Sequence, residues 1–169
     1  MVIPAVIVNG VYALATALLI VAALHDFALR VIPNAIPLGL SVIGIVVRIN
    51  DHTILLGATF AAAVFAAAFF CWRRGWMGGG DVKLLAATAL VVSPFQVGSF
   101  LVLTAQCGGL LALLYLVLSR TVRLPPPGRL GVCNPIARVI RAERWRICRG
   151  APLPYGFAIA TGGITLLLK

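Results

Sequence analysis

The sequence predicts an all-α, polytopic membrane protein of about six transmembrane helices, and three observations lead to this fold class. The mean hydropathy is +1.07, and hydrophobic residues make up 62% of the chain. Charged residues make up 11%, whereas a soluble domain carries roughly 25%. Apolar stretches recur, and about 20 apolar residues cross a hydrocarbon core of about 30 Å. Six crossings use nearly all 169 residues, so we expect one membrane-embedded domain, 1–169.

The expected spans follow from the apolar runs and the breaks between them. No Lys or Arg precedes the first run, so a retained helix is favoured over a cleaved signal peptide. The fourth begins at Asp81 or Val82 and ends at the Ser93-Pro94 break, because proline interrupts helices. In order, the segments are residues 2–24, 36–49, 53–72, 81–93, 97–118 and 153–168.

The basic residues predict how the chain crosses the membrane. The gaps after the first, third and fifth segments hold Arg30, Arg73, Arg74, Lys83, Arg120, Arg123, Arg129, Arg138, Arg141, Arg144, Arg146 and Arg149. The opposite side holds only Arg48 and Lys169. Because cytoplasmic loops are enriched in Lys and Arg, these three gaps are expected in the cytoplasm and both termini outside it.

The long basic gap, about residues 120–151, carries a pattern of its own. A proline run ending at Gly128 is a stiff spacer, and Asn134-Pro135 and Gly150 are typical of a helix start and stop. One face of this segment is apolar and the rest rich in arginine, which predicts an amphipathic helix bound to anionic lipid headgroups. The alternative is a basic loop that only sets topology.

Two other classes of function are disfavoured. The +10 charge is spread over gaps between apolar runs and forms no base-reading motif, so no nucleic-acid partner is expected. The cysteines show no C-x-x-C spacing, so we expect reduced thiols, no metal site and no cofactor. The four are Cys71, Cys107, Cys133 and Cys148.

Two aspartates are the candidate catalytic residues. A membrane chain avoids carboxylates unless they serve a purpose, yet Asp26 closes the first apolar run and Asp81 opens the fourth. The charge pattern places both at the same, cytoplasmic membrane boundary. Two nearby carboxylates share a proton, so one can act as base and the other as acid in the attack of water on a peptide carbonyl. The structural alternative is that they cap helices or pair with Lys83 and Arg30.

A glycine run stands directly before the second aspartate. Gly78, Gly79 and Gly80 carry no side chain, so another backbone can approach closely and positive φ is permitted. An extended substrate strand could then be held beside Asp81 by main-chain hydrogen bonds. A flexible hairpin between two helices is the plainer interpretation.

These residues together resemble a known family. The segment from Gly78 to Leu85, GGGDVKLL, resembles the G-x-G-D motif of intramembrane aspartyl proteases, in the form used by type IV prepilin peptidases. Asp26 followed by Ile32-Pro33-Asn34 resembles that family's first-aspartate motif. Pro154-Tyr155-Gly156 resembles a third, less specific feature. Order, spacing and the six-helix layout match over nearly the whole chain.

The resemblance implies a membrane aspartyl endopeptidase of the prokaryotic cytoplasmic membrane, with Asp26 and Asp81 as its catalytic pair. The implied substrate is a prepilin whose short basic leader is removed on the cytoplasmic side. The implied substrate-binding or site-shaping residues are Gly78, Gly79, Gly80, Lys83, Ile32, Pro33, Asn34, Pro154 and Gly156.

The chain departs from the long form of this family and leaves other functions open. It lacks the cytoplasmic insert with paired C-x-x-C motifs that accompanies N-methylation of the mature pilin. It therefore resembles the short form associated with Flp or tight-adherence pili, and an archaeal preflagellin-peptidase relative is the other possibility. A catalytically silent scaffold for pilus or secretion assembly is an alternative, and a proton-coupled transporter is a further one. The sequence does not give the oligomeric state.

Overall fold

The computed structural model describes residues 5–121, 144–146 and 153–168. Within these ranges every regular element is a helix. The predicted basic helix falls mostly outside them, although its residues 144–146 are helical. The chain divides into two compact units, one running to Gly108 and resuming at Pro154, the other covering residues 109–153. The expectation of one domain stays a prediction.

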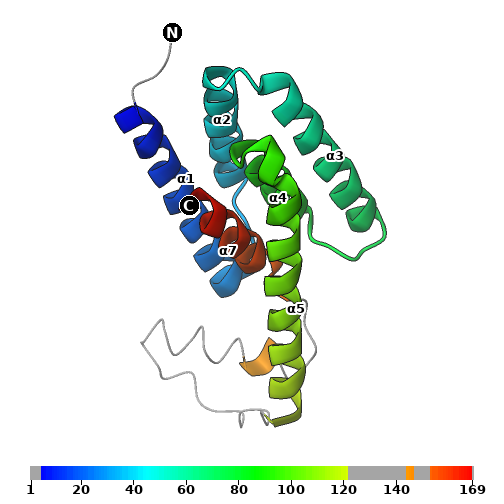
Figure 1. Cartoon of the computed structure of the whole chain (residues 1–169). Coiled ribbons are helices and arrows are strands. Elements are labelled where there is room, and N and C mark those ends of the chain that lie inside the picture. Colours follow the sequence, from blue (N-terminus) through cyan, green and yellow to red (C-terminus); the bar gives the residue numbers. More distant parts are fainter. Residues whose placement is uncertain (1–4, 122–143, 147–152, 169) are drawn as a thin grey trace. The chain divides into compact units, whose positions relative to one another are not determined.

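The helices follow the predicted segments closely, and their boundaries differ by a few residues. Figure 1 shows their order. They are α1 (Ala5–Leu29), α2 (Ala35–Asn50), α3 (Ile54–Arg73), α4 (Gly79–Val91), a 3-10 turn (Pro94–Gln96), α5 (Val97–Thr121) and α7 (Tyr155–Leu167).

Three helices are long and apolar enough to cross a membrane: Val8–Leu29 in α1, Ile54–Arg73 and Pro94–Thr121. Helices α2 and α7 are apolar but shorter. The 13 residues of α4 reach only about 20 Å at 1.5 Å per residue, well below the hydrocarbon thickness. The all-α, multi-pass character is therefore confirmed, whereas six crossings and the outside termini stay predictions.

The short helix α4 forms the centre of the first unit. It packs mainly against α2 and α3 and also against α7, while α1 packs mainly against α7. Its buried residues cover most of its circumference: Val82, Leu84, Leu85, Ala87, Thr88, Ala89 and Val91. Lys83, Ala86 and Leu90 leave one stripe less covered, and on the other sides neighbouring side chains fill the space around the helix.

Glycines allow the helices of this unit to approach closely. A methyl group at Gly44 of α2 would lie 2.8 Å from Cγ of Leu90 on α4. A methyl group at Gly163 of α7 would lie 2.8 Å from Cγ2 of Thr88 and 3.0 Å from Cδ1 of Leu19. Small residues at such contacts are typical of helix packing in membranes, where close van der Waals contact replaces the hydrophobic driving force.

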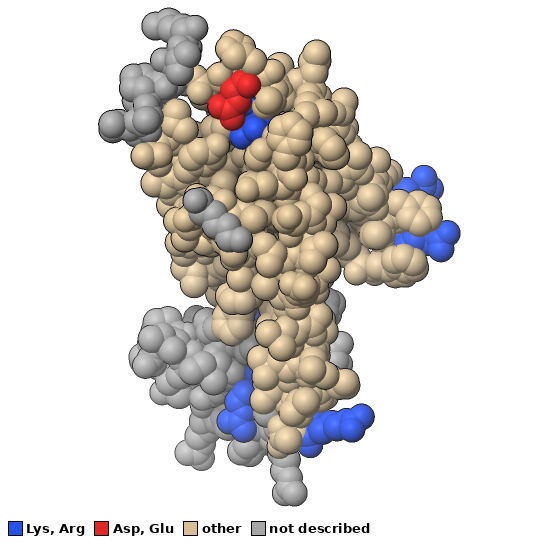
Figure 2. All heavy atoms as spheres, in the orientation of Figure 1, with Lys and Arg blue, Asp and Glu red and all other residues tan. Residues whose placement is uncertain are grey.

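An arginine that the sequence suggested only as a topology signal is buried at the end of this unit. Arg48 is 2% exposed, and its guanidinium donates to the carbonyl oxygen of Val91 and to Oγ1 of Thr53, each at 3.3 Å. It also pairs with Asp51 at 3.3 Å. It therefore ties α2 to the start of α3 and the end of α4. On the face shown in Figure 2, one cluster of acidic atoms lies directly beside basic atoms.

Candidate active site

Asp26 lies in the last turn of α1 and is only 6% exposed. The helix ends at Leu29, and the next residue, Arg30, has φ of 57° and donates its N–H to the carbonyl oxygen of Asp26 at 2.9 Å. A left-handed residue often ends a helix, but it is usually glycine, since a side chain there costs about 1–2 kcal/mol. This turn sends the chain back toward Ile32 beside the aspartate.

Asp81 is the third residue of α4, and Gly78 is the N-cap. The Asp81 carboxylate accepts a backbone hydrogen bond from Gly78, and a methyl group on Gly78 would lie 3.0 Å from its Oδ2. This is the geometry of a capping residue that reaches back to the helix start. The helix-capping alternative therefore describes the placement of Asp81 correctly, and it does not exclude a catalytic role.

Ile32 and Gly156 connect the surroundings of the two aspartates. A methyl group on Gly156, in the first turn of α7, would lie 2.9 Å from Oδ2 of Asp26 and 3.0 Å from Cδ1 of Ile32. On its other side Ile32 meets the glycine run, because a methyl group on Gly80 would lie 3.3 Å from its Cβ. Contacts between Asp26 and Gly156, Gly156 and Ile32, and Ile32 and Gly80 therefore connect the two aspartates, because Gly80 directly precedes Asp81.

The electrostatics of Asp81 confirm this proximity. Asp81 is half-buried at the beginning of α4, outside the three long spans. Burial raises the pKa of its carboxyl from 3.8 to about 6, and the negative charge of Asp26 adds to the rise. The Gly78 hydrogen bond and the charge of Arg30 oppose it. A carboxyl with such a pKa can hold or release a proton near neutral pH.

The glycine run serves close contact rather than unusual backbone angles. Gly78, Gly79 and Gly80 all have φ outside the left-handed region, and Gly78 is extended at φ −72°. Each has a neighbour that a larger residue would displace, which for Gly79 is Nε1 of Trp72, 3.3 Å from the position of a methyl group. The atoms that approach the run belong to side chains, and the permitted positive φ is not used, so the approach of a substrate strand stays a prediction.

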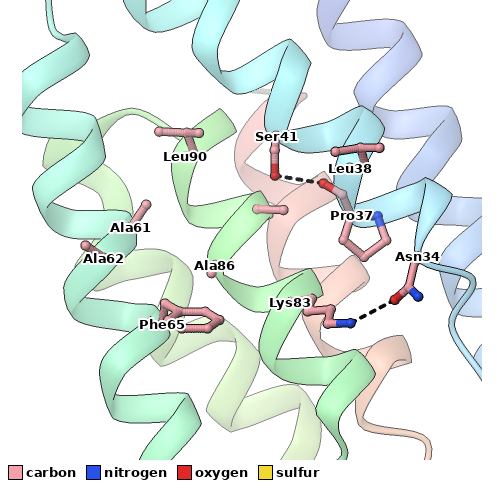
Figure 3. A pocket seen from close by; sticks show the side chains of 11 residues that line it. Asn34, Pro37, Leu38, Ser41, Ala61, Ala62, Phe65, Lys83, Ala86 and Leu90 are labelled. Carbon is pink, nitrogen blue, oxygen red and sulfur yellow. Dashed lines mark hydrogen bonds between the residues drawn. The ribbon is translucent and has the colours of Figure 1, made fainter.

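Lys83 and Asn34 join the two motifs at the surface. The Lys83 ammonium donates to Oδ1 of Asn34 at 2.9 Å, across 49 residues of sequence (Figure 3). Pro33 shapes the turn before α2, since its carbonyl oxygen accepts the N–H of Ile36 at 3.1 Å. This hydrogen bond joins the start of α2 to the first turns of α4, beside the aspartate pair.

The start of α7 brings the third motif to the same place. Pro154 is the N-cap of α7 and is buried. Tyr155 packs on α5, where a methyl group at Gly108 would lie 3.0 Å from its ring. Tyr155 also lies within electrostatic range of Asp81. The structure thus brings Asp26, Ile32, Gly156 and the glycine run with Asp81 together, and Asn34 joins them through Lys83.

Three neighbours of the site were not among the predicted site residues. The charge of Arg30 lowers the pKa of Asp81, and Tyr155 lies within electrostatic range of Asp81. Trp72 packs on the glycine run. Arg30 and Tyr155 could have been named from the sequence, because both lie within or beside a motif. Trp72 lies outside the three motifs. The described residues contain no group of three His, Cys, Asp or Glu side chains that could hold a metal.

Comparison with protein families identifies the chain. The model of the type IV leader peptidase family matches residues 13–113. The chain belongs to this family. The matched range contains Asp26, Ile32-Pro33-Asn34 and the glycine run with Asp81, whereas Gly156 lies outside it and joins the site through its contact with Asp26. No curated protein and no solved structure gives a significant match.

Membership gives the general activity. A type IV leader peptidase is a hydrolase that acts on prepilin-type precursors in a membrane context. The helices α1, α3 and α5, with their long apolar sequences, agree with a multi-pass membrane peptidase.

Proposed function

We propose that the chain is an aspartyl endopeptidase that removes the short basic leader from Flp-like or other type IV prepilins at the cytoplasmic membrane face. Asp26 and Asp81 would activate water between them. The observation that carries the proposal is the placement of Asp26 and Asp81 on either side of the Gly156–Ile32–Gly80 contact, with their charges coupled.

The proposed mechanism requires one proton on the pair. The raised pKa of Asp81, about 6, increases the fraction of the pair in which one carboxyl retains a proton while the other is ionised. The ionised carboxylate takes a proton from water as the oxygen attacks the scissile carbonyl. The protonated carboxyl then hydrogen-bonds the developing oxyanion and supplies the proton for the leaving amine. No covalent intermediate forms in this scheme.

The proposed substrate follows from where the pair lies and from the resemblance. Asp26 ends a membrane-spanning helix and Asp81 begins α4, so the pair suits a peptide bond at the membrane boundary. The positive-inside pattern favours the cytoplasmic boundary. Without the C-x-x-C insert of the long form, we propose peptidase activity alone, with no N-methylation of the mature pilin.

Co-expression with a Flp-type prepilin tests the proposal. Leader removal is followed as a gel shift for wild type, Asp26→Asn, Asp81→Asn and the double variant, at equal membrane levels. Glu143→Gln is the control, because it removes a carboxylate that the proposal does not use. We expect cleavage by wild type and the control only.

The double variant distinguishes a pair from two separate contributions. Residues that act as a unit give non-additive losses, so the double variant should be no less active than either single variant. Cleavage by both single variants would disprove the two-aspartate mechanism. Failure of wild type on a panel of Flp-type, type IV and preflagellin precursors would favour the silent scaffold instead.

A further inference from the structure

A groove on the outer side of α2, α3 and α4 lies beside the candidate active site. Its volume is about 520 Å³. Figure 3 shows it from close by. It is lined by Asn34, Pro37, Leu38, Ser41, Ala61, Ala62, Phe65, Lys83, Ala86, Ala87 and Leu90.

The floor of the groove offers no hydrogen bonds. Four alanines form much of it, and Phe65 and Leu90 contribute to its walls. Ser41 also lines the groove, but its hydroxyl already donates to the carbonyl oxygen of Pro37 at 2.8 Å. An extended peptide here would leave its backbone N–H and C=O groups without partners, which costs several kcal/mol per group in a membrane. A hydrocarbon chain has no such cost.

The groove suits a narrow occupant. From Lys83 to Leu90 it follows α4 for about 10 Å at 1.5 Å per residue. Its volume is about 520 Å³, and a single acyl chain is thin enough to lie along it.

A fixed positive charge stands at one end of the groove. The ammonium of Lys83 is exposed and uses one of its three N–H donors on Asn34, so two remain for an anion. Lys83 is the only ionisable residue among those that line the groove. Arg73 and Arg74 end α3 just before α4 begins, and Figure 2 shows basic atoms gathered at that end of α3.

We propose that this groove binds one anionic phospholipid, with its headgroup phosphate on Lys83 and one acyl chain along the alanine floor. The site is separate from the basic segment 120–151, for which lipid contact was expected from the sequence. It is also independent of the peptidase reaction, so it can be tested without a substrate.

The test uses spin-labelled phosphatidylglycerol and phosphatidylcholine in phosphatidylcholine vesicles containing the full-length protein. Electron paramagnetic resonance gives the fraction of each lipid held by the protein. We expect Lys83→Gln to lower the preference for phosphatidylglycerol by about five-fold, the effect of one basic residue at a membrane surface. Arg73→Gln is the control, because it removes the same charge at the same end but outside the groove.

A second pair of variants tests the acyl-chain part. Ala62→Leu fills the groove, whereas Ala67→Leu adds the same volume to an exposed position of α3 that does not line it. We expect only Ala62→Leu to remove the preference. Equal effects of Lys83→Gln and Arg73→Gln, or none of Ala62→Leu, would overturn the proposal.

Photocrosslinking from position 62 in native membranes identifies the occupant. Adducts with phospholipid would support the proposal. Adducts with a co-expressed prepilin or with a second copy of the chain would overturn it in favour of that occupant.

Discussion

Replacing Gly156 with alanine tests the link between α7 and Asp26 directly. The new methyl group would lie 2.9 Å from Oδ2 of Asp26 and 3.0 Å from Cδ1 of Ile32, whereas ordinary contacts begin near 3.4 Å. The carboxylate or α7 must therefore move by about 0.5 Å. Overpacking of this kind costs about 1–3 kcal/mol of stability. Misplacing a reacting group by about 1 Å can cost about 100-fold in rate.

We therefore expect Gly156→Ala to lower prepilin cleavage by about 10- to 100-fold. The measurement is kcat/KM on a synthetic prepilin, with Tm followed on the same detergent-solubilised samples. Gly98→Ala is the matched control, because nothing lies within 4 Å of the added methyl group. That variant should keep full activity and gain up to about 1 kcal/mol from better helix propensity. Cleavage by Gly156→Ala equal to that of the control would refute the reasoning.

Three further predictions concern stability. Asp81 has a raised folded-state pKa of about 6, so the stability of wild type should fall as pH rises from about 4 through 6. Asp81→Asn lacks this loss. Its free energy of unfolding should therefore gain on that of wild type over this range, by about 1–2 kcal/mol after allowance for partial exposure, and its Tm should rise relative to wild type. A Tm difference independent of pH would contradict this. Arg48→Met should lower the free energy of unfolding by about 2–3 kcal/mol, since the Val91 carbonyl loses its donor. Denaturant unfolding measures this change. Unchanged stability would show that the contacts of Arg48 do not stabilise the fold. Gly163→Ala should lose about 1–3 kcal/mol of stability. Adding Thr88→Ser removes the clashing Cγ2 but leaves the contact with Leu19, so it should recover part of the lost Tm. No recovery would place the strain elsewhere.

The sequence predicted which motifs would meet at the candidate site, but not how they pack together. Asp26 and Asp81 could be found because carboxylates are rare in an apolar chain and because both stand in short, recognisable motifs. The contact of Gly156 with Asp26 could not be predicted, because it depends on how α7 packs against α1. The same holds for the hydrogen bond between Lys83 and Asn34, which are 49 residues apart.

Arg48 shows the corresponding limit for the fold. In sequence it is a lone cation at the end of an apolar segment, and the positive-inside rule counts it as a loop charge. Its burial follows from three partners on separate elements: Asp51, Thr53 and Val91. No local pattern brings these together. The length of α4 was predicted closely, but hydropathy could not show that protein surrounds most of it, because apolar residues look alike whether protein or lipid surrounds them.

The short helix α4 is fastened to α2 at both ends, by Lys83 on Asn34 and by Arg48 on Val91. These two helices should therefore move as one rigid part. Asp81 belongs to that part, whereas Asp26 belongs to α1, which packs mainly on α7. In the proposed reaction the two carboxylates would therefore come from different pairs of helices. The gap between them would depend on how α7 packs against both α1 and α4.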